Sequence, residues 1–239
     1  MRKALAAAAL AFSFHASAGV VYDFRTTVES ERFSENASGR VWVEGDSYRA
    51  EVTRADGKRL AVISRDADRT ATILDLQSHT AKPRVRVSGP VLSSSIFHFP
   101  IGRASVFGIP IVTYRRDGRT TIARERAVVH VIEARFAVVS DRGQVGGTYN
   151  VIARIATSEN LPSLPMKTPI RTGYASVDEQ LAKAADNLRG MVLRHELEIR
   201  RALDGGPTQI ERTTTVVTKL QRAEIPATQF AVTVTPVAQ

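Results

Sequence analysis

The stretch SGRVWVEGDSYRAEV, residues 38–52, decides the fold class. Its first half alternates, so that Val41 and Val43 lie on one face of a strand and Trp42 lies on the other. Gly45-Asp46 supplies a turn, after which apolar and charged residues alternate again. A period of two on both sides of a short turn predicts an antiparallel hairpin with one apolar face and one polar face.

The same period continues in both directions along the chain. Asp56-Gly57 is a strong hairpin signal, and Pro83 with Pro90 marks a loop or an edge strand, because proline cannot donate to a sheet ladder. Asp117-Gly118 predicts a further hairpin turn. We expect strands at 21–29, 39–44, 48–53, 59–64, 70–76, 105–115, 128–139, 148–156, 191–203 and 208–222, with 93–100 as a short helix or a covering loop. Short, closely spaced strands of this kind pair with their sequential neighbours in an antiparallel sheet.

One segment has the period of a helix. Residues 176–189 open with Ser176-Val177-Asp178-Glu179, which has the pattern of a capping box, and Gly190 follows as a C-cap. Apolar residues recur on one face of this segment, at Leu181, Ala184 and Leu188. We expect this face to pack on the concave side of the sheet, against Leu193, Leu197 and Ile199 of the next strand.

Residues 1–18 have the pattern of a secretory signal peptide. Two basic residues precede an apolar run at 4–14, and Ala16-Ser17-Ala18 is a small-residue cleavage site. The alternative, an uncleaved anchor, is disfavoured because the run is about half the length that spans a bilayer. We expect cleavage after Ala18, a periplasmic location, and a single domain over residues 19–239.

Composition excludes several classes of protein. The chain of 239 residues is 43% hydrophobic and 24% charged and has no cysteine, which excludes a disordered chain, a disulfide scaffold and any thiolate or Cys-zinc site. The net charge of +9 comes from basic residues that are spread out and alternate with apolar ones. This arrangement indicates a solvated sheet face rather than a nucleic-acid site, and it leaves open a weak attraction to anionic membranes.

No motif for catalysis or metal binding is present. His79, His98, His130 and His195 have no metal-ligand spacing, and His195 shares a face with Leu193 and Leu197, which is typical of a core or cavity histidine. The start of a calcium loop at 66–70 lacks the required Gly and Glu at its sixth and twelfth positions. Carboxylates alternate with arginines, as in cross-strand charge pairs. We therefore expect no enzyme, no catalytic residue, no metal and no cofactor.

The residues Ser38-Gly39-Arg40-Val41-Trp42-Val43 and the closing Pro226-Ala227-Thr228-Gln229-Phe230 resemble the LolA/LolB-like half-barrel superfamily of lipoprotein carriers. From Arg154 to Phe230 the chain looks more like an uncharacterised exported family of the DUF4412 type. The resemblance implies a mainly β fold: a half-open, unclosed antiparallel β-barrel wrapped around one principal α-helix. It also implies an apolar concave face.

Taken together, these features predict an exported, non-enzymatic binding protein that holds an acyl chain or lipid on the concave face. The expected lining is apolar: Val41, Val43, Leu60, Val62, Leu181, Leu188, Leu193, Leu197 and Ile199. The alternative is an envelope sensor or scaffold protein that binds a protein partner and has no small-molecule ligand. Expected partners are a lipid or lipoprotein acyl chain, an envelope protein and a peripheral membrane contact, with no nucleic acid.

Overall fold

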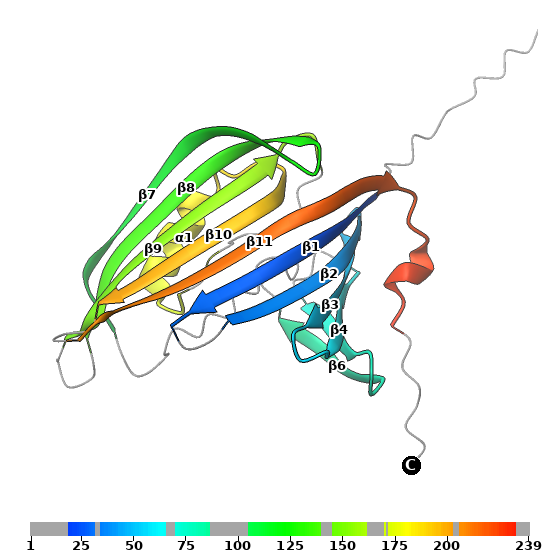
Figure 1. Ribbon diagram of the computed structural model, residues 1–239, viewed down its shortest axis with the longest axis horizontal. Helices are drawn as coiled ribbons and strands as arrows, with labels where there is room; N and C mark the ends of the chain where they lie inside the picture. The colour runs from blue at the N-terminus through cyan, green and yellow to red at the C-terminus, as the bar shows by residue number, and fades with distance from the viewer. Residues whose placement is uncertain are drawn as a thin grey trace, which may run out of the picture.

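The computed structural model describes residues 19–31, 34–65, 70–86, 105–139, 145–161, 170, 172–202 and 206–232. In this part of the chain, eleven strands form one sheet in the order β6-β5-β4-β3-β2-β1-β11-β10-β9-β8-β7 (Figure 1). The end strands β6 and β7 do not neighbour each other in this order, so the sheet is not closed. The predicted fold class, an unclosed antiparallel barrel with one α-helix, is confirmed.

Consecutive strands pair antiparallel except β6 and β7, which lie at the two ends of the sheet, and the first strand pairs with the last. The bounds are β1 (Gly19–Ser30), β2 (Ser34–Glu44), β3 (Ser47–Arg54), β4 (Arg59–Ser64), β5 (Thr70–Asp75), β6 (Thr80–Arg86), β7 (Ser105–Ile122), β8 (Glu125–Val139), β9 (Val145–Ser158), β10 (Met191–Ala202) and β11 (Thr208–Ala223), with α1 (Ala175–Ala185) and the 3-10 turn η2 (Ala227–Phe230). Among the described helices, none is long and apolar enough to cross a bilayer. The predicted signal peptide and the segment 93–100 lie outside the described residues.

The predicted helix bounds and cap need correction. The helix covers Ala175–Ala185, its N-cap is Tyr174, and no side chain caps it there. The Asp178 carboxylate instead reaches back and accepts hydrogen bonds from the backbone N–H groups of Thr172 (2.7 Å) and Gly173 (3.1 Å). Glu179 pairs with Lys183 on the exposed face at 2.9 Å. The capping box predicted from Ser176 and Glu179 is wrong, because Ser176 lies inside the first turn and the acid that faces the preceding loop is Asp178.

Gly190 is required, but as the entry to β10 rather than as a helix cap. Its φ is +79°, and a Cβ there would lie 2.0 Å from the Ser158 carbonyl oxygen. The helix ends five positions earlier, at Ala185. Gly190 therefore allows the chain to turn against the end of β9 and begin β10 beside it.

The turn predicted at Asp117-Gly118 is wrong. Strand β7 continues through this pair with a register shift between Arg116 and Arg119, and Gly118 has φ +90°. The hairpin turn lies at Ala123-Arg124, which both have positive φ. A bulge at the Asp-Gly pair keeps residues 119–122 in the ladder, where they gain additional backbone hydrogen bonds with β8.

The C-terminal segment docks on the far side of the first strands. Ile225 and Phe230 form a small apolar cluster with Val21, Ala61, Ile63 and Leu74. The Arg65 Nε donates to the Phe230 carbonyl at 2.9 Å, and Arg49 donates to the Gln229 carbonyl at 3.2 Å. Trp42 packs against this cluster, on the face opposite to Val41, as the alternation predicts.

Gly39→Ala tests why the fold-deciding strand contains a glycine. A Cβ at Gly39 would lie 2.2 Å from the Glu51 carbonyl oxygen and 2.6 Å from the Phe24 ring. We expect the free energy of unfolding to fall by about 2 kcal/mol or more in urea titrations, because the strands must separate to admit the methyl group. The control is Gly146→Ala, where the nearest atom is 3.4 Å away. Equal stability of the two variants would contradict this packing.

Candidate functional site

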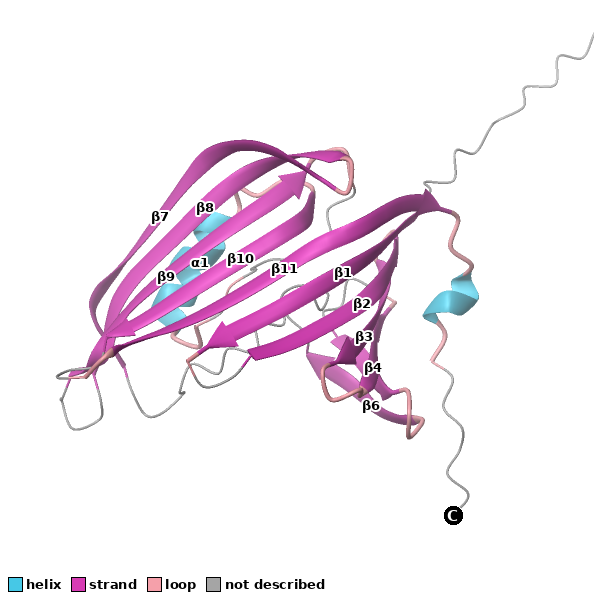
Figure 2. Cartoon of the chain, viewed as in Figure 1, coloured by secondary structure: helices cyan, strands magenta, loops and turns pink. Residues whose placement is uncertain are grey.

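The inner face of the sheet is defined here as the face on which α1 packs. Leu181 of α1 is 1% exposed and belongs to one apolar cluster with Ile132, Val151 and Leu197 of the strands. The helix contacts β7 and β8, and it lies behind β9 and β10 in the view of Figure 2. An 11-residue helix is about 16 Å long and about 10 Å wide, which is roughly two strand spacings. It therefore covers only one part of an eleven-stranded sheet.

The register carries the inner face across to the first strands. Leu197 of β10 pairs with Thr213 of β11. Thr215, two residues further along β11 and therefore on the same face, pairs with Thr26 of β1. From there the face continues through Tyr22 and its partner Val41 into β3 and β4. The inner face of β1–β4 is apolar and buried, at Val20, Tyr22, Phe24, Val41, Val43, Tyr48, Ala50, Val52 and Val62.

The nine predicted lining residues fall into two groups. Val41, Val43, Val62 and Leu193 belong to the apolar cluster of the first strands, and Leu60, partly buried, pairs with Val52 beside it. Leu181, Leu197 and Ile199 belong to the cluster under the helix, and Leu188 packs against that cluster. The expectation that the helix faces Leu193 as well as Leu197 is wrong. A bulge between Val192 and Arg194 shifts the register there.

Four polar atoms on the inner face are buried without a hydrogen-bond partner among the described residues. They are the hydroxyls of Tyr22 and Tyr48, Thr213 Oγ1 and His195 Nε2. Buried polar atoms are normally paired, because leaving one unpaired costs about 1–3 kcal/mol. Of these four residues, only His195 stands out in the sequence. The signal for the others is that Tyr22, Tyr48 and Thr213 fall on the same alternating positions as the apolar residues.

Burial keeps both tyrosines protonated. It raises the pKa of Tyr48 to about 12, and it raises the pKa of Tyr22 further, with an added contribution from the nearby Tyr48 phenol. A protonated phenol can donate one hydrogen bond and accept another. The inner face of β1–β3 therefore offers two neutral donors within an apolar surface.

Two histidines lie in one row across the inner face. His130 and His195 both pair with Ile155, from opposite sides. His130 is satisfied by the Tyr114 hydroxyl at 2.9 Å and by Thr157 Oγ1 at 3.0 Å. Burial lowers the pKa of His195 to about 4, and burial together with the Arg116 charge lowers that of His130. Both rings are therefore neutral at neutral pH, and no metal-holding group of three or more acidic or histidine side chains occurs in the described part of the chain.

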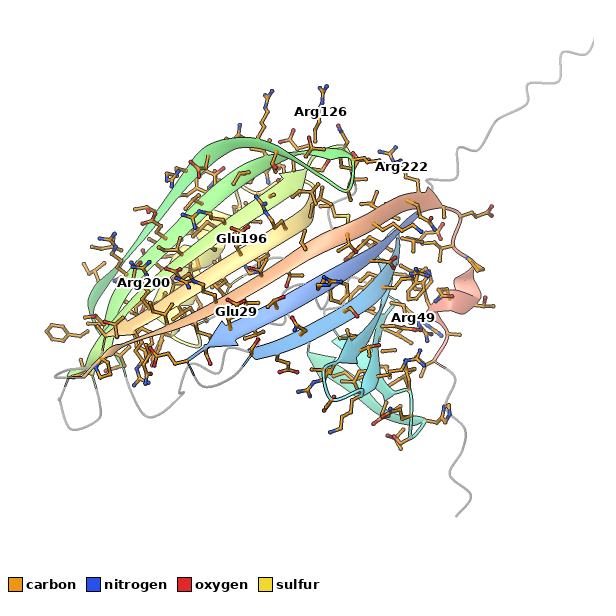
Figure 3. All side chains as sticks on the ribbon, viewed as in Figure 1. Glu29, Arg49, Arg126, Glu196, Arg200 and Arg222 are labelled. Carbon is orange, nitrogen blue, oxygen red and sulfur yellow. The ribbon has the colours of Figure 1, made fainter. Side chains whose placement is uncertain are left out.

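Outside the apolar cluster under the C-terminal segment, the opposite, outer face carries charged side chains that pair with one another. Asp23 bonds Arg40 at 2.5 Å, and Glu198 bonds both Arg200 and Arg212, at 2.6 Å and 2.8 Å. Figure 3 shows labelled charged side chains such as Glu196 and Arg200 on the face toward the viewer, away from α1. These ion pairs confirm the prediction of charge pairing on the outer face.

Two grooves are lined by described residues. One, of about 560 Å³, has Arg40, Trp42 and Glu51 among its lining residues. The other, of about 590 Å³, lies over the ends of β8–β11 and includes Arg135 and Arg200. Neither contains any of the nine predicted lining residues. The first groove is mainly polar, whereas the second is mainly apolar and includes Phe136 and Tyr149 of the cluster under the helix.

Comparison with known proteins gives structural similarities alone, and two of them are described here. No family model and no curated protein matches the sequence. The chain is similar to a Vibrio parahaemolyticus domain named for outer membrane lipoprotein sorting, with 7% identity, 90% of each chain covered and a TM-score of 0.33. It is also similar to a DUF1329 family protein from Desulfovibrio piger, with 7% identity, 91% of each chain covered and a TM-score of 0.35. Both TM-scores are low, so the function is argued below from the residues of this chain.

His195→Gln tests the burial of the unpartnered imidazole. The folded-state pKa of about 4 lies below the ordinary 6.5, so the unfolded chain takes up a proton first and stability falls as pH drops between these values. From about pH 7 to about pH 5, wild type should lose about 2 kcal/mol more than the variant in urea titrations. The control is His79→Asn, at an exposed histidine with positive φ that asparagine tolerates. Parallel pH profiles of wild type and His195→Gln would contradict the buried neutral ring.

Proposed function

We propose that this chain is an exported, non-enzymatic binding protein that holds the acyl chain of a lipid against the inner face of β1–β4. The observation that carries the proposal is the pair of hydroxyls, Tyr22 and Tyr48, which lie in apolar surroundings and have no hydrogen-bond partner in the part of the chain that the structure describes. A lipid has the complementary chemistry, because its hydrocarbon chain matches the valines and its ester oxygens accept hydrogen bonds. The apolar lining comprises Val41, Val43, Leu60, Val62 and Leu193.

The second part of the predicted lining has a different role in this proposal. Leu181, Leu188, Leu197 and Ile199 bind the helix to the sheet. In this proposal the helix closes one part of the inner face as ordinary core, and the ligand binds at the β1–β4 part, whose side chains are buried and must open to admit it. Burying a chain of ten methylenes would contribute about 8 kcal/mol before the cost of ordering it.

The polar groups favour binding over catalysis. Tyr22, Tyr48 and His195 are neutral at neutral pH and lie within apolar surroundings. The acidic side chains named above are paired with arginines on the outer face. Neutral donors in an apolar surface fix the orientation of a ligand without activating a nucleophile.

The proposal includes export. Residues 1–18 carry the signal-peptide pattern, and Gly19 is the first residue of β1. Cleavage after Ala18 therefore leaves the whole sheet intact and places the protein in the periplasm. The intact mass of the exported protein tests this, since a mass that retains residues 1–18 would contradict it. Membership of the LolA/LolB-like superfamily and of the DUF4412 type is part of the same proposal.

Tyr22→Phe and Tyr48→Phe test the binding face. With a pyrene-labelled phosphatidylethanolamine as probe, each variant should bind about threefold to tenfold more weakly, because one hydrogen bond to the lipid is lost. The ligand-free variants should be as stable as wild type or more stable, because each change removes a buried hydroxyl for which the described residues provide no partner.

Tyr174→Phe is the matched control. Tyr174 is also buried, but it belongs to the cluster under α1 and stacks edge-on with Phe136. Its variant should bind the probe as wild type does. If wild-type protein binds neither this lipid nor a free fatty acid, the binding proposal fails and the scaffold alternative replaces it.

A further inference from the structure

The edge strand β7 exposes three large apolar side chains at one end. Phe107 is 67% exposed, Ile109 is 88% exposed and Ile111 is 62% exposed. They fall on alternate positions of a strand that ends the sheet. Large apolar side chains gathered on a surface mark a place of contact with another molecule.

The backbone at this end does not suit a partner strand. The ladder with β8 is interrupted between Phe107 and Ile111, Gly108 has φ +73°, and Pro110 lacks an N–H group. Bulges and prolines are the features with which proteins prevent strand addition at an edge. The apolar side chains are therefore offered to a partner that needs no backbone hydrogen bonds.

The charge along the same edge is positive. Arg115, Arg116 and Arg119 are exposed on β7, and the one acid among residues 115–119, Asp117, pairs with Arg115. From Ile111 to Arg115 the strand rises about 13 Å. In the ladder, Ile111 pairs with Arg135, which lines the groove of about 590 Å³ together with Arg200. An apolar end with basic residues further along the strand and on the neighbouring strand β8 complements a surface that has a hydrocarbon interior and anionic headgroups.

We propose that the β7 edge docks on an anionic lipid bilayer, with Phe107, Ile109 and Ile111 inserted among the acyl chains and Arg115, Arg116, Arg119 and Arg135 along the headgroups. The contact is peripheral and is distinct from the ligand face of β1–β4. It places one side of the half-open barrel at the membrane surface. This inference goes beyond the proposed function and stands on separate residues.

Vesicle co-sedimentation of the exported protein tests the docking. Wild type should bind phosphatidylglycerol-containing vesicles and bind pure phosphatidylcholine vesicles much more weakly. The double variant Phe107→Ser, Ile109→Ser should lose about tenfold in partitioning per residue. The variant Arg115→Gln, Arg116→Gln, Arg119→Gln should lose about fivefold per arginine on the anionic vesicles alone.

The control is Thr113→Ser, an exposed position on the same strand, which should bind vesicles as wild type does. Phe107→Ser, Ile109→Ser should also still bind the labelled phosphatidylethanolamine, so that a failure of docking is distinguishable from a failure of the lipid-binding proposal. If wild type does not bind anionic vesicles, or if the double variant binds them as wild type does, the docking proposal is overturned. The proposal is also overturned if wild type is an oligomer and the double variant is a monomer, because the edge would then contact a second copy of the chain.

Discussion

The structure depends on one constraint: a sheet of eleven strands that does not close has more apolar inner face than one short helix can cover. Strand twist curls the sheet, and a curled sheet must bury its inner side chains against something. Helix α1 meets this need near β7 and β8. The valines and tyrosines of β1–β4 belong to a different apolar cluster from the one in which α1 packs on the sheet. The proposed lipid would meet the rest of this need, beside hydroxyls that have no partner among the described residues.

Much of the fold could be predicted from local pattern. The alternation around Val41 and Trp42 specifies which side chains face inward, and a hairpin register preserves that choice across the sheet. The pairing of β1 with β11 joins residues at opposite ends of the described chain, and no local signal carries it. The turn of β7 was placed at Asp117-Gly118 because this pair is a strong turn signal. The ladder with β8 instead absorbs the pair as a bulge, a tertiary preference that the sequence alone does not show.

The candidate site could be predicted only in its apolar part. Period two places Val41, Val43 and Leu197 inward because apolar residues define that face. The alternation also places Tyr22 and Tyr48 on the inward face, but it does not show whether their hydroxyls are hydrogen-bonded in the core. Only the three-dimensional surroundings show that these hydroxyls have no partner among the described residues. The exposure of Phe107 and Ile109 was hidden for a similar reason, since an apolar strand pattern ordinarily predicts burial.

The two proposed surfaces have different roles: the inner face of β1–β4 binds a lipid, and the β7 edge docks on a membrane. The inner face supplies neutral donors and hydrocarbon, and the β7 edge supplies hydrocarbon and positive charge. The most direct test of the account is a high-resolution crystal structure of the exported protein purified without detergent. The account predicts elongated non-protein density over β1–β4, with an oxygen within hydrogen-bond distance of the Tyr22 or Tyr48 hydroxyl. An inner face filled by protein side chains, with both hydroxyls bonded to protein groups, would contradict it.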